Sequence, residues 1–209
     1  MTVGAYAVYS YLGSGMIVSV SHPNVVGGLN LSYGSAGTYP GLDEFGRVVE
    51  QKWTKADGTV LEQIAYDYDS AGNRTYRANL AASEAGTRLD ELYTYDDLSR
   101  LLRWERGELN DDKSALTSTP AYFQQFALDS LGNWTSLNDN GQQQTRTHDP
   151  LNRAGIIRDL RGWISPSYDA AGNMTRMPEP GCESNALYAT YDAWGRMVKV
   201  EEGSSGGEL

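Results

Sequence analysis

The chain has 209 residues, of which 40% are hydrophobic, and its formal net charge at pH 7 is -10. This negative charge repels phosphate backbones, so we expect no nucleic acid among the partners. No apolar run approaches the ~20 residues that a membrane helix needs, so we expect no membrane insertion. The length allows a single domain or one stretch of a repeat array.

Residues 1–41 are predicted to form strands of divergent repeat units, with turns marked by glycine and proline. The first twenty residues are moderately apolar, but they lack a basic leader and are interrupted by Gly13, Ser14 and Gly15. This pattern favours strands over a signal peptide. If the protein is exported, we expect its signal to lie upstream of this chain.

From residue 42 onward a six-residue unit recurs seven times, which indicates a repeat architecture. It begins at Leu42, Tyr68, Tyr95, Leu128, His148, Tyr168 and Tyr191. Its second residue is always aspartate, at positions 43, 69, 96, 129, 149, 169 and 192, so the steps are 26, 27, 33, 20, 20 and 23 residues. Steps of this length suit one β-hairpin for each unit.

Each unit has the chemistry of a tight turn between two strands. Residues alternate before the aspartate, as in Tyr66-Asp67-Tyr68, which is typical of a strand with one packed face. The carboxylate can accept bonds from nearby backbone amides, and a glycine three residues later supplies a positive φ. The predicted turn residues are Asp43, Gly46, Asp69, Gly72, Asp96, Asp129, Gly132, Asp149, Asp169, Gly172, Asp192 and Gly195. Ser99 and Asn152 replace glycine in two units, and since serine tolerates positive φ poorly we expect a different turn shape at Ser99.

The residue after the turn glycine position alternates between arginine and asparagine through all seven units. Each asparagine is followed two positions later by threonine, and two such positions share a strand face. The alternation predicts two kinds of contact between neighbouring units. It also predicts that Asn73, Asn133 and Asn173 occupy equivalent environments.

The predicted organisation has three parts. Residues 1–41 form divergent strands, and residues 42–200 hold the seven repeats. The longest step contains a polar insertion near 105–120, predicted to be an exposed loop or a short helix. Residues 201–209 have the Gly/Ser-rich composition of a flexible tail.

The tyrosine-aspartate units with Gly-Arg or Gly-Asn turns resemble the YD repeats of bacterial Rhs proteins and teneurin-type proteins, over roughly residues 42–200. The resemblance implies an all-β fold, in which tandem antiparallel hairpins form a continuous curved or spiralling sheet. In that family complete shells enclose a C-terminal polymorphic toxin or belong to large cell-surface proteins, and this chain resembles an arc of such a wall. The family's self-cleavage motif is not recognisable, because Asp149-Pro150 is a lone Asp-Pro within an ordinary unit.

The sequence predicts no catalytic residue, no metal site and no cofactor, and therefore no enzyme. His22 and His148 are the only histidines, and Cys182 has no nearby histidine or second cysteine. Paired aspartates at 67 and 69 and at 96 and 97 suit calcium, but the turn role already explains them. Glycosylation sequons at Asn30, Asn73, Asn133 and Asn173 have a packing explanation for the last three.

We expect a structural scaffold, part of an extracellular or cell-surface shell that encloses or displays another polypeptide or assembles with itself. Its expected partners are adjacent repeats or other copies through sheet edges, and an encapsulated C-terminal domain. The alternative is a carbohydrate-binding adhesion module that uses exposed Tyr and Trp rings. A hydrolase with paired carboxylates is a third class that nothing in the spacing indicates.

Overall fold

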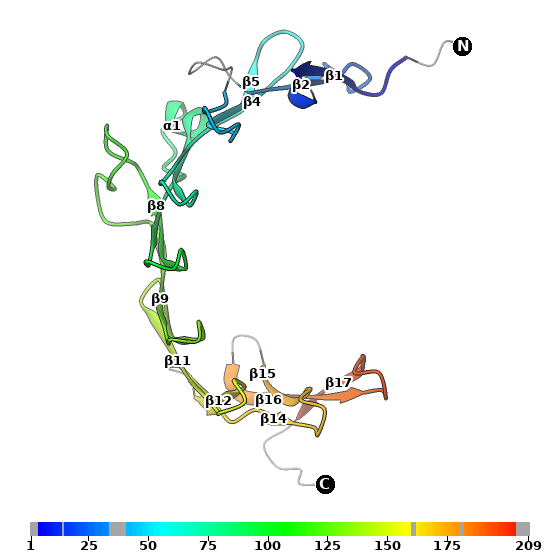
Figure 1. The fold of residues 1–209 in the computed structure, drawn as a ribbon, viewed down its shortest axis with the longest axis vertical. Coiled ribbons are helices and arrows are strands. Elements are labelled where there is room, and N and C mark those ends of the chain that lie inside the picture. Colours follow the sequence, from blue (N-terminus) through cyan, green and yellow to red (C-terminus); the bar gives the residue numbers. More distant parts are fainter. Residues whose placement is uncertain (1–3, 14, 34–40, 160–161, 180–181, 204–209) are drawn as a thin grey trace. The chain divides into compact units, whose positions relative to one another are not determined.

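A computed structural model describes residues 4–13, 15–33, 41–159, 162–179 and 182–203, and the side chains of 182–184 lie outside this description. Strands dominate the described residues, which contain one helix of five residues (Figure 1). The elements of the N-terminal part are β1 (Val8–Leu12), β2 (Met16–His22), β3 (Leu29–Ser32), β4 (Glu50–Thr54), β5 (Val60–Tyr68), β6 (Arg74–Asn79), α1 (Leu80–Glu84) and β7 (Asp90–Tyr95). They are followed by β8 (Leu101–Gly107), β9 (Tyr122–Leu128), β10 (Trp134–Asp139), β11 (Gln142–His148), β12 (Ala154–Arg158), β13 (Trp163–Ile164), β14 (Ser167–Tyr168), β15 (Met174–Glu179), β16 (Cys182–Tyr191) and β17 (Met197–Gly203).

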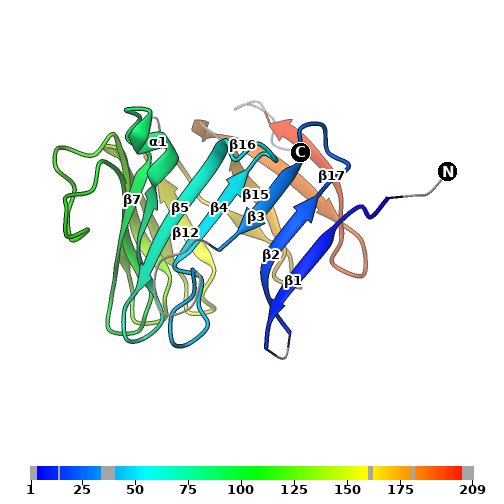
Figure 2. The same cartoon turned by 90° about the horizontal axis from the view of Figure 1, so that it is seen from above.

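The chain divides into two compact units. Unit 1 comprises Met1–Ser99 with Trp104–Tyr122, and unit 2 comprises Arg100–Arg103 with Phe123–Leu209. Within unit 1 the strands β1 to β5 lie side by side, each antiparallel to the next (Figure 2). Strands β9 to β12 in unit 2 are likewise paired antiparallel in chain order.

Strands pair in sequence order from β1 to β7 within unit 1 and from β9 to β13 within unit 2, and β14 to β17 form a second sheet of unit 2. The predicted all-β architecture of antiparallel hairpins is therefore confirmed. Among the described strands of unit 2, the ladder of hydrogen bonds is interrupted between β13 and β14, where the chain runs through Ser165 and Pro166. Proline has no N–H to donate, so it suits the end of a ladder.

A meander places every second connection at the same edge of its sheet. The aspartate units form the connections between β5 and β6 in unit 1, and between β9 and β10 and between β11 and β12 in unit 2. The turns at Asp129 and Asp149 therefore lie at the same edge of the unit 2 sheet, next to each other.

Unit 1 buries a small set of aliphatic side chains on both faces of its sheet, because Ile64 pairs with Asn79 whereas Ala78 pairs with Ala65, the neighbour of Ile64. Ile64 on β5 is completely buried, and Ala78 on β6 is 2% exposed. Leu42 and Leu109 are also buried, although both lie outside the named strands. Burying such side chains is the main stabilising contribution of a sheet this thin.

In unit 2 the second sheet packs on the end of the first through a small core. Ile157 on β12 pairs with Ile164 on β13, and both are buried together with Ala186 of β16. Ala154 packs against this cluster. The contact joins the two sheets within unit 2, beside the interruption at Pro166.

A β-bulge follows the turns on their outgoing strands. Tyr68 pairs with Arg74, but the next pair is Asp67 with Tyr76, so Thr75 is an extra residue. The same irregularity occurs beside Thr135 and Thr175. Because a bulge changes the alternation of side chains, counting positions from the asparagine does not give the face of these threonines.

The insertion near 105–120 is a loop and not a helix. After β8 the chain makes an isolated bridge between Leu109 and Leu116, and Asn110 accepts bonds through its side chain from Ser114 and Ala115. The short-helix alternative for this segment is therefore wrong. The described helix is α1 instead, where the Asn79 side chain accepts from the Ala82 amide.

Residues 204–209 of the predicted tail lie outside the described residues, whereas Glu201, Glu202 and Gly203 belong to β17. Across the part of the chain that is described, no helix is long and apolar enough to cross a membrane.

Candidate functional site

The aspartate turns are the most regular polar feature of the molecule. At Asp69, Oδ1 accepts from the Asn73 amide at 2.8 Å and Oδ2 accepts from Asn73 Nδ2 at 2.9 Å. The Gly72 amide donates to the Asp69 carbonyl, and the Asp69 amide donates to the Asn73 carbonyl. The Asp69 carboxylate thus accepts the hydrogen bonds that the turn's N–H groups cannot make to a neighbouring strand.

The other turns repeat this arrangement. Oδ1 accepts from the amide four residues on and Oδ2 from its side chain at Asp43, Asp129, Asp149, Asp169 and Asp192. At Asp96 the carboxylate accepts from the Leu98 amide, and the Asp96 carbonyl accepts from the Ser99 amide. We call the residue four positions after the aspartate the fork residue.

Fork residues define two turn classes. Arg-type turns end at Arg47, Arg100, Arg153 and Arg196, and Asn-type turns end at Asn73, Asn133 and Asn173. Arginine offers Nε and asparagine offers Nδ2 to the aspartate oxygen, at 2.6 Å from Arg47 and 2.9 Å from Asn73. Both residue types therefore close the same turn, and the alternation must have another cause.

The turn hydrogen bonds keep the carboxylates ionised. In the Asn-type turns, the pKa values of Asp69, Asp129 and Asp169 are lowered chiefly by the bond from the fork asparagine. In the Arg-type turns of Asp149 and Asp192, the bond from the backbone amide of the fork arginine is the main cause of the lowered pKa. The site therefore favours the charged form in both classes.

The backbone before the fork residue differs between the classes. In Asn-type turns, φ is 89° at Gly72, 91° at Gly132 and 88° at Gly172. Arg-type turns have smaller values, which are 78° at Gly46, 60° at Ser99, 65° at Asn152 and 72° at Gly195. The left-handed helical region lies near 57°, so a side chain is accommodated more easily in the Arg-type turn. Both substitutes for glycine occur in that class, and φ at Ser99 is the smallest of the seven turns.

Fork asparagines also reach the next turn of the chain. Asn73 Nδ2 donates to Ser99 Oγ at 3.1 Å, and Asn133 Nδ2 donates to Asn152 Oδ1. Asn173 lies beside the equivalent residue, Gly195, where a Cβ would be 3.4 Å from Asn173 Oδ1, although glycine offers no side-chain acceptor. The three asparagines thus share one environment, beside the third residue after the aspartate of the following unit.

Fork arginines reach a different part of the next turn. Arg47 lies over the Tyr68 ring at 4.6 Å, with Nη1 3.5 Å from the Asp69 carbonyl oxygen. Arg100 Nη1 donates to the Asp129 carbonyl at 3.0 Å. In the same way Arg153 stacks on the ring of Tyr168, the tyrosine of the next unit. The longer side chain therefore spans to the aspartate carbonyl and the ring beside it.

Tyrosines that precede the aspartate bind the preceding repeat. The hydroxyl of Tyr68 donates to the Val48 carbonyl at 2.9 Å, and that of Tyr168 donates to the Ala154 carbonyl at 3.0 Å. Tyr191 does the same to the Met174 carbonyl. In each case the acceptor directly follows the fork residue of the previous turn.

Large apolar side chains at the turn tips were not anticipated from the sequence. They occupy the second position after the aspartate and are 71 to 79% exposed at Phe45, Leu98, Leu131, Leu151 and Trp194. An apolar residue between the turn aspartate and its glycine was the available signal. Exposed apolar residues that recur at one structural position are typical of a contact surface.

Unit 1 carries a charged cluster around Glu91, which is 8% exposed. Its carboxylate accepts from the Tyr93 hydroxyl at 2.6 Å and from Arg106 Nη2 at 2.7 Å, and Arg77 lies 4.0 Å away. Burial opposes ionisation of Glu91, but these donors lower its pKa overall. These bonds to Glu91 indicate a cross-strand stabilising role, although Nε of Arg106 is buried without a hydrogen-bond partner.

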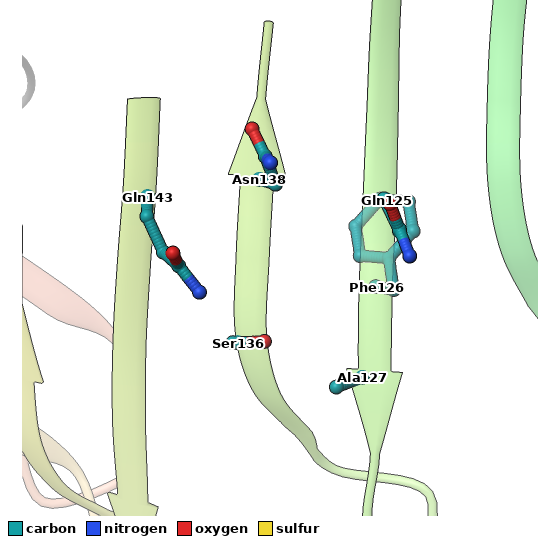
Figure 3. Close-up of a pocket in the computed structure, with 6 residues that line it drawn as sticks. All are labelled: Gln125, Phe126, Ala127, Ser136, Asn138 and Gln143. Carbon is teal, nitrogen blue, oxygen red and sulfur yellow. The ribbon is translucent and has the colours of Figure 1, made fainter. Parts of the chain in front are cut away.

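Unit 2 presents an amide row on three neighbouring strands. Gln125 on β9 and Gln143 on β11 both pair with Asn138 on β10, and the three side chains line a hollow of about 150 Å³ (Figure 3). Asn138 Oδ1 accepts from the Gly141 amide, and Gln125 Oε1 accepts from Arg103. The hollow is open and polar, and it contains no acid or base arranged for catalysis.

A second row runs beside the amide row on the same face. It consists of the mutually paired residues Ala127, Ser136, Thr145, Arg158 and Trp163. The indole of Trp163 is 57% exposed at the end of this row. The two rows together form a polar surface of hydroxyl, amide and guanidinium groups with the exposed Trp163 ring at its end, and we call this surface the polar platform.

The remaining candidates stay apart from one another. His22 Nδ1 lies 3.4 Å from the Tyr6 carbonyl, and His148 pairs with Ala154 at the start of a turn. The Cys182 side chain lies outside the described residues. Among the residues whose placement is described, no group of three or more His, Cys, Asp or Glu could hold a metal ion.

No protein-family model and no curated protein matches the sequence. Solved structures do match. The fold is that of part of TcdB2-TccC3. The crystal structure of TcdB2-TccC3 has a TM-score of 0.54 and 16% identity, with 95% of this chain and 11% of that chain covered.

Two related crystal structures give the same result. TcdB2-TccC3 without its hypervariable C-terminal region and TcdB2-TccC3-Cdc42 each have a TM-score of 0.55 at 14% identity. In both, 96% of this chain is covered and 12% of the other chain. At this identity the likeness establishes the fold, and the chain spans about an eighth of those proteins.

Proposed function

We propose that this chain is a structural segment of a YD-repeat shell of the Rhs type, which encloses or displays another polypeptide. The observation that carries the proposal is the bonding of Arg47, Asn73, Arg100 and Asn133 to the turn that follows each of them. The hydroxyls of Tyr68 and Tyr168 bond in the reverse direction. Such contacts allow successive repeats to stabilise each other. An array with nearest-neighbour bonding is suited to building an extended wall.

The comparisons support a wall that belongs to a larger protein. The matched segments are 11 to 12% of the TcdB2-TccC3 chains, and one of those structures lacks a hypervariable C-terminal region. We extend to this chain the idea that the repeats surround a variable polypeptide. The exposed apolar turn tips at Leu131, Leu151 and Trp194 would then contact neighbouring structure.

The proposed role requires no chemical step by this chain. Its aspartates are occupied by turn hydrogen bonds, as at Asp69 and Asp149, and its buried carboxylate Glu91 is bonded to tyrosine and arginine. We further propose an extracellular or cell-surface location, where an assembled wall would protect its contents.

Electron microscopy of the natural polypeptide that contains this segment tests the proposal. We expect a hollow particle whose wall includes the segment, and we expect the enclosed region to resist added protease until the wall is opened by denaturant. A solid or extended particle, with every region equally sensitive to protease, would overturn the shell function.

A second candidate is glycan binding at the polar platform of unit 2. The exposed Trp163 ring could stack on a sugar while the amides of Gln125 and Gln143 bond its hydroxyls. A glycan array probed with the chain and with Trp163→Ala tests this role. Binding that is lost in the variant supports it, and the absence of binding by the unaltered chain removes it.

A further inference from the structure

Two side chains of the amide row in unit 2 have their oxygen atoms already occupied. Asn138 Oδ1 accepts from the Gly141 amide at 2.8 Å, and Gln125 Oε1 accepts from Arg103 Nη1 at 2.7 Å. An amide N–H and a guanidinium can only donate, so these bonds fix which end of each side-chain amide carries the oxygen. The groups that Asn138 and Gln125 offer to a ligand are therefore the donors Nδ2 and Nε2.

These two donors lie side by side at one end of the hollow. Gln125 pairs with Asn138 across β9 and β10, and paired residues on neighbouring strands have Cβ atoms about 5 Å apart. Ala127 and Ser136 are the next pair on the same face and line the other end of the hollow (Figure 3). The hollow thus has two amide donors at one end, and a methyl and a hydroxyl group at the other.

Gln143 on β11 lines a third side of the hollow. It pairs with Asn138, and its side chain extends toward β10 (Figure 3). Its amide supplies both a donor and an acceptor. The hollow measures about 150 Å³, whereas pockets that hold a whole small molecule begin at roughly 300 Å³. It therefore suits one substituent of a larger ligand.

The exposed ring of Trp163 lies at the other end of the polar platform. It is joined to Ser136 of the hollow by the cross-strand pairs of Thr145 and Arg158, so the ring and the hollow share one face. Neighbouring strands lie about 4.8 Å apart, which places β13 about 14 Å from β10. A short oligosaccharide spans this distance, with one sugar stacked on the ring and another over the hollow.

We propose that the hollow is a subsite for the acetamido group of an N-acetylated amino sugar, within an oligosaccharide that stacks on Trp163. This inference rests on the glycan-binding role proposed above and names its ligand. The acetamido oxygen accepts from Asn138 Nδ2 and Gln125 Nε2, and the acetamido N–H donates to Gln143 Oε1. The methyl group contacts Ala127. A sugar hydroxyl in the same place is too short to reach both ends of the hollow.

An acidic sugar fits the hollow less well, although its carboxylate would also accept from the two amides. All residues that line the hollow are uncharged, so no ion pair compensates for the loss of water around a carboxylate. The chain has a formal net charge of -10, which lowers the local concentration of anions. The methyl group of Ala127 also has no apolar partner on a carboxylate. The hollow therefore favours a neutral acceptor.

An NMR titration of the full isotope-labelled chain with matched trisaccharides tests the subsite. Triacetylchitotriose carries acetamido groups, cellotriose carries hydroxyl groups in their place, and the corresponding triglucuronate carries carboxylates. We expect triacetylchitotriose to bind at least about fivefold more tightly than the other two, because it gains the bonds to the two amides. It should shift the side-chain NH2 signals of Gln125 and Asn138 and the indole signal of Trp163.

Two isosteric variants remove the donors and keep the acceptors. Asn138→Asp retains an oxygen for the Gly141 amide and Gln125→Glu retains one for Arg103, but each loses its NH2 group. Each should weaken binding of triacetylchitotriose by about fivefold or more. Gln142→Glu is the matched control, because it makes the same change of charge on the opposite face of β11 and should leave binding unchanged. Thermal unfolding checks that each variant is folded.

Three outcomes overturn the inference, namely equal binding of cellotriose, tighter binding of triglucuronate, or undiminished binding by both isosteric variants. An equal loss in the Gln142→Glu control also overturns it, because the added charge and not the missing donor would then be the cause. If a glycan array shows binding that depends on Trp163 while triacetylchitotriose does not bind, the acetamido subsite fails and the glycan role stands. If the array shows no binding, both fail, and the shell function is tested separately by electron microscopy.

Discussion

Asn73 donates a hydrogen bond from Nδ2 to Ser99 Oγ, 3.1 Å away and 26 residues later in the chain. The same nitrogen donates to Asp69 Oδ2 in its own turn. One amide group therefore closes a turn and joins it to the next. This dual role explains why the side chain length at the fork position matters, although arginine and asparagine close their own turns equally well.

A double-mutant cycle measures this connection. Asn73→Ala and Ser99→Ala should each lower the free energy of unfolding, and their coupling should be about 0.5 to 1.5 kcal/mol, the contribution of one hydrogen bond. Chemical denaturation of the two single variants and the double variant gives the value. Pairing Asn73→Ala with Ser118→Ala is the control, and a coupling there as large as with Ser99 would contradict the assignment.

Asparagine substitutions should discriminate the two turn classes. Gly172→Asn and Gly195→Asn both meet open or ordinary space, since no atom lies within 4 Å of a Cβ at Gly172 and the nearest lies at 3.4 Å at Gly195. Their φ values of 88° and 72° differ, and the smaller one is closer to the left-handed helical region. We expect Gly172→Asn to destabilise by about 1 kcal/mol more than Gly195→Asn. Thermal unfolding decides, and the reverse order would contradict the two-class description.

Core truncations should have large effects in both units. Ile64→Ala in unit 1 and Ile164→Ala in unit 2 each remove a side chain that is at most 1% exposed, so each should cost about 2 to 5 kcal/mol. Leu61→Ala is a matched control on the same strand as Ile64 and is 48% exposed. Its effect, measured by the same denaturant titration, should stay below about 1 kcal/mol. Equal losses from Ile64→Ala and Leu61→Ala would mean that β5 does not bury Ile64.

Stability should fall in acid because of the turn carboxylates. Folding lowers the pKa of Asp69, Asp129 and Asp169 below the ordinary value of 3.8. A lowered pKa contributes stability above the unfolded value, and this contribution is lost as pH falls through the folded pKa. Denaturation at a series of pH values should therefore show a decline that sets in below about pH 4. Carboxyl titrations followed by NMR should give midpoints under 3.8 for these residues, and midpoints above 3.8 would contradict the hydrogen-bonded turns.

The sequence predicts much of the fold because each six-residue unit contains the residues that end a strand and reverse the chain. An alternating strand ending in Asp69, with Gly72 three residues later, specifies a reversal wherever it occurs. Composition does not reveal the bulges, since Thr75 and Thr135 resemble ordinary strand residues. It also does not reveal α1, because five residues are too few for a helical period and the helix depends on the Asn79 cap.

The site was predictable only in part. Alternation of arginine and asparagine indicates two kinds of contact, but the partner atoms depend on which turns the meander brings together. Asn133 bonds to Asn152, whereas Arg100 bonds to the Asp129 carbonyl. These partners differ because arginine is longer than asparagine and because the fold decides which turn lies next to each side chain. The exposed row ending at Trp163 likewise depends on the register of β11, β12 and β13, which no local pattern specifies.

Exchanging two fork residues tests the central claim most directly. The double variant Asn133→Arg with Arg153→Asn keeps composition, net charge and a donor for Asp129 and Asp149, and changes only which fork residue faces which turn. If fork residues couple successive repeats, the free energy of unfolding should fall by about 1 kcal/mol or more. Unfolding at the same denaturant concentration as the unaltered chain would show that the alternation carries no coupling, and would contradict the account.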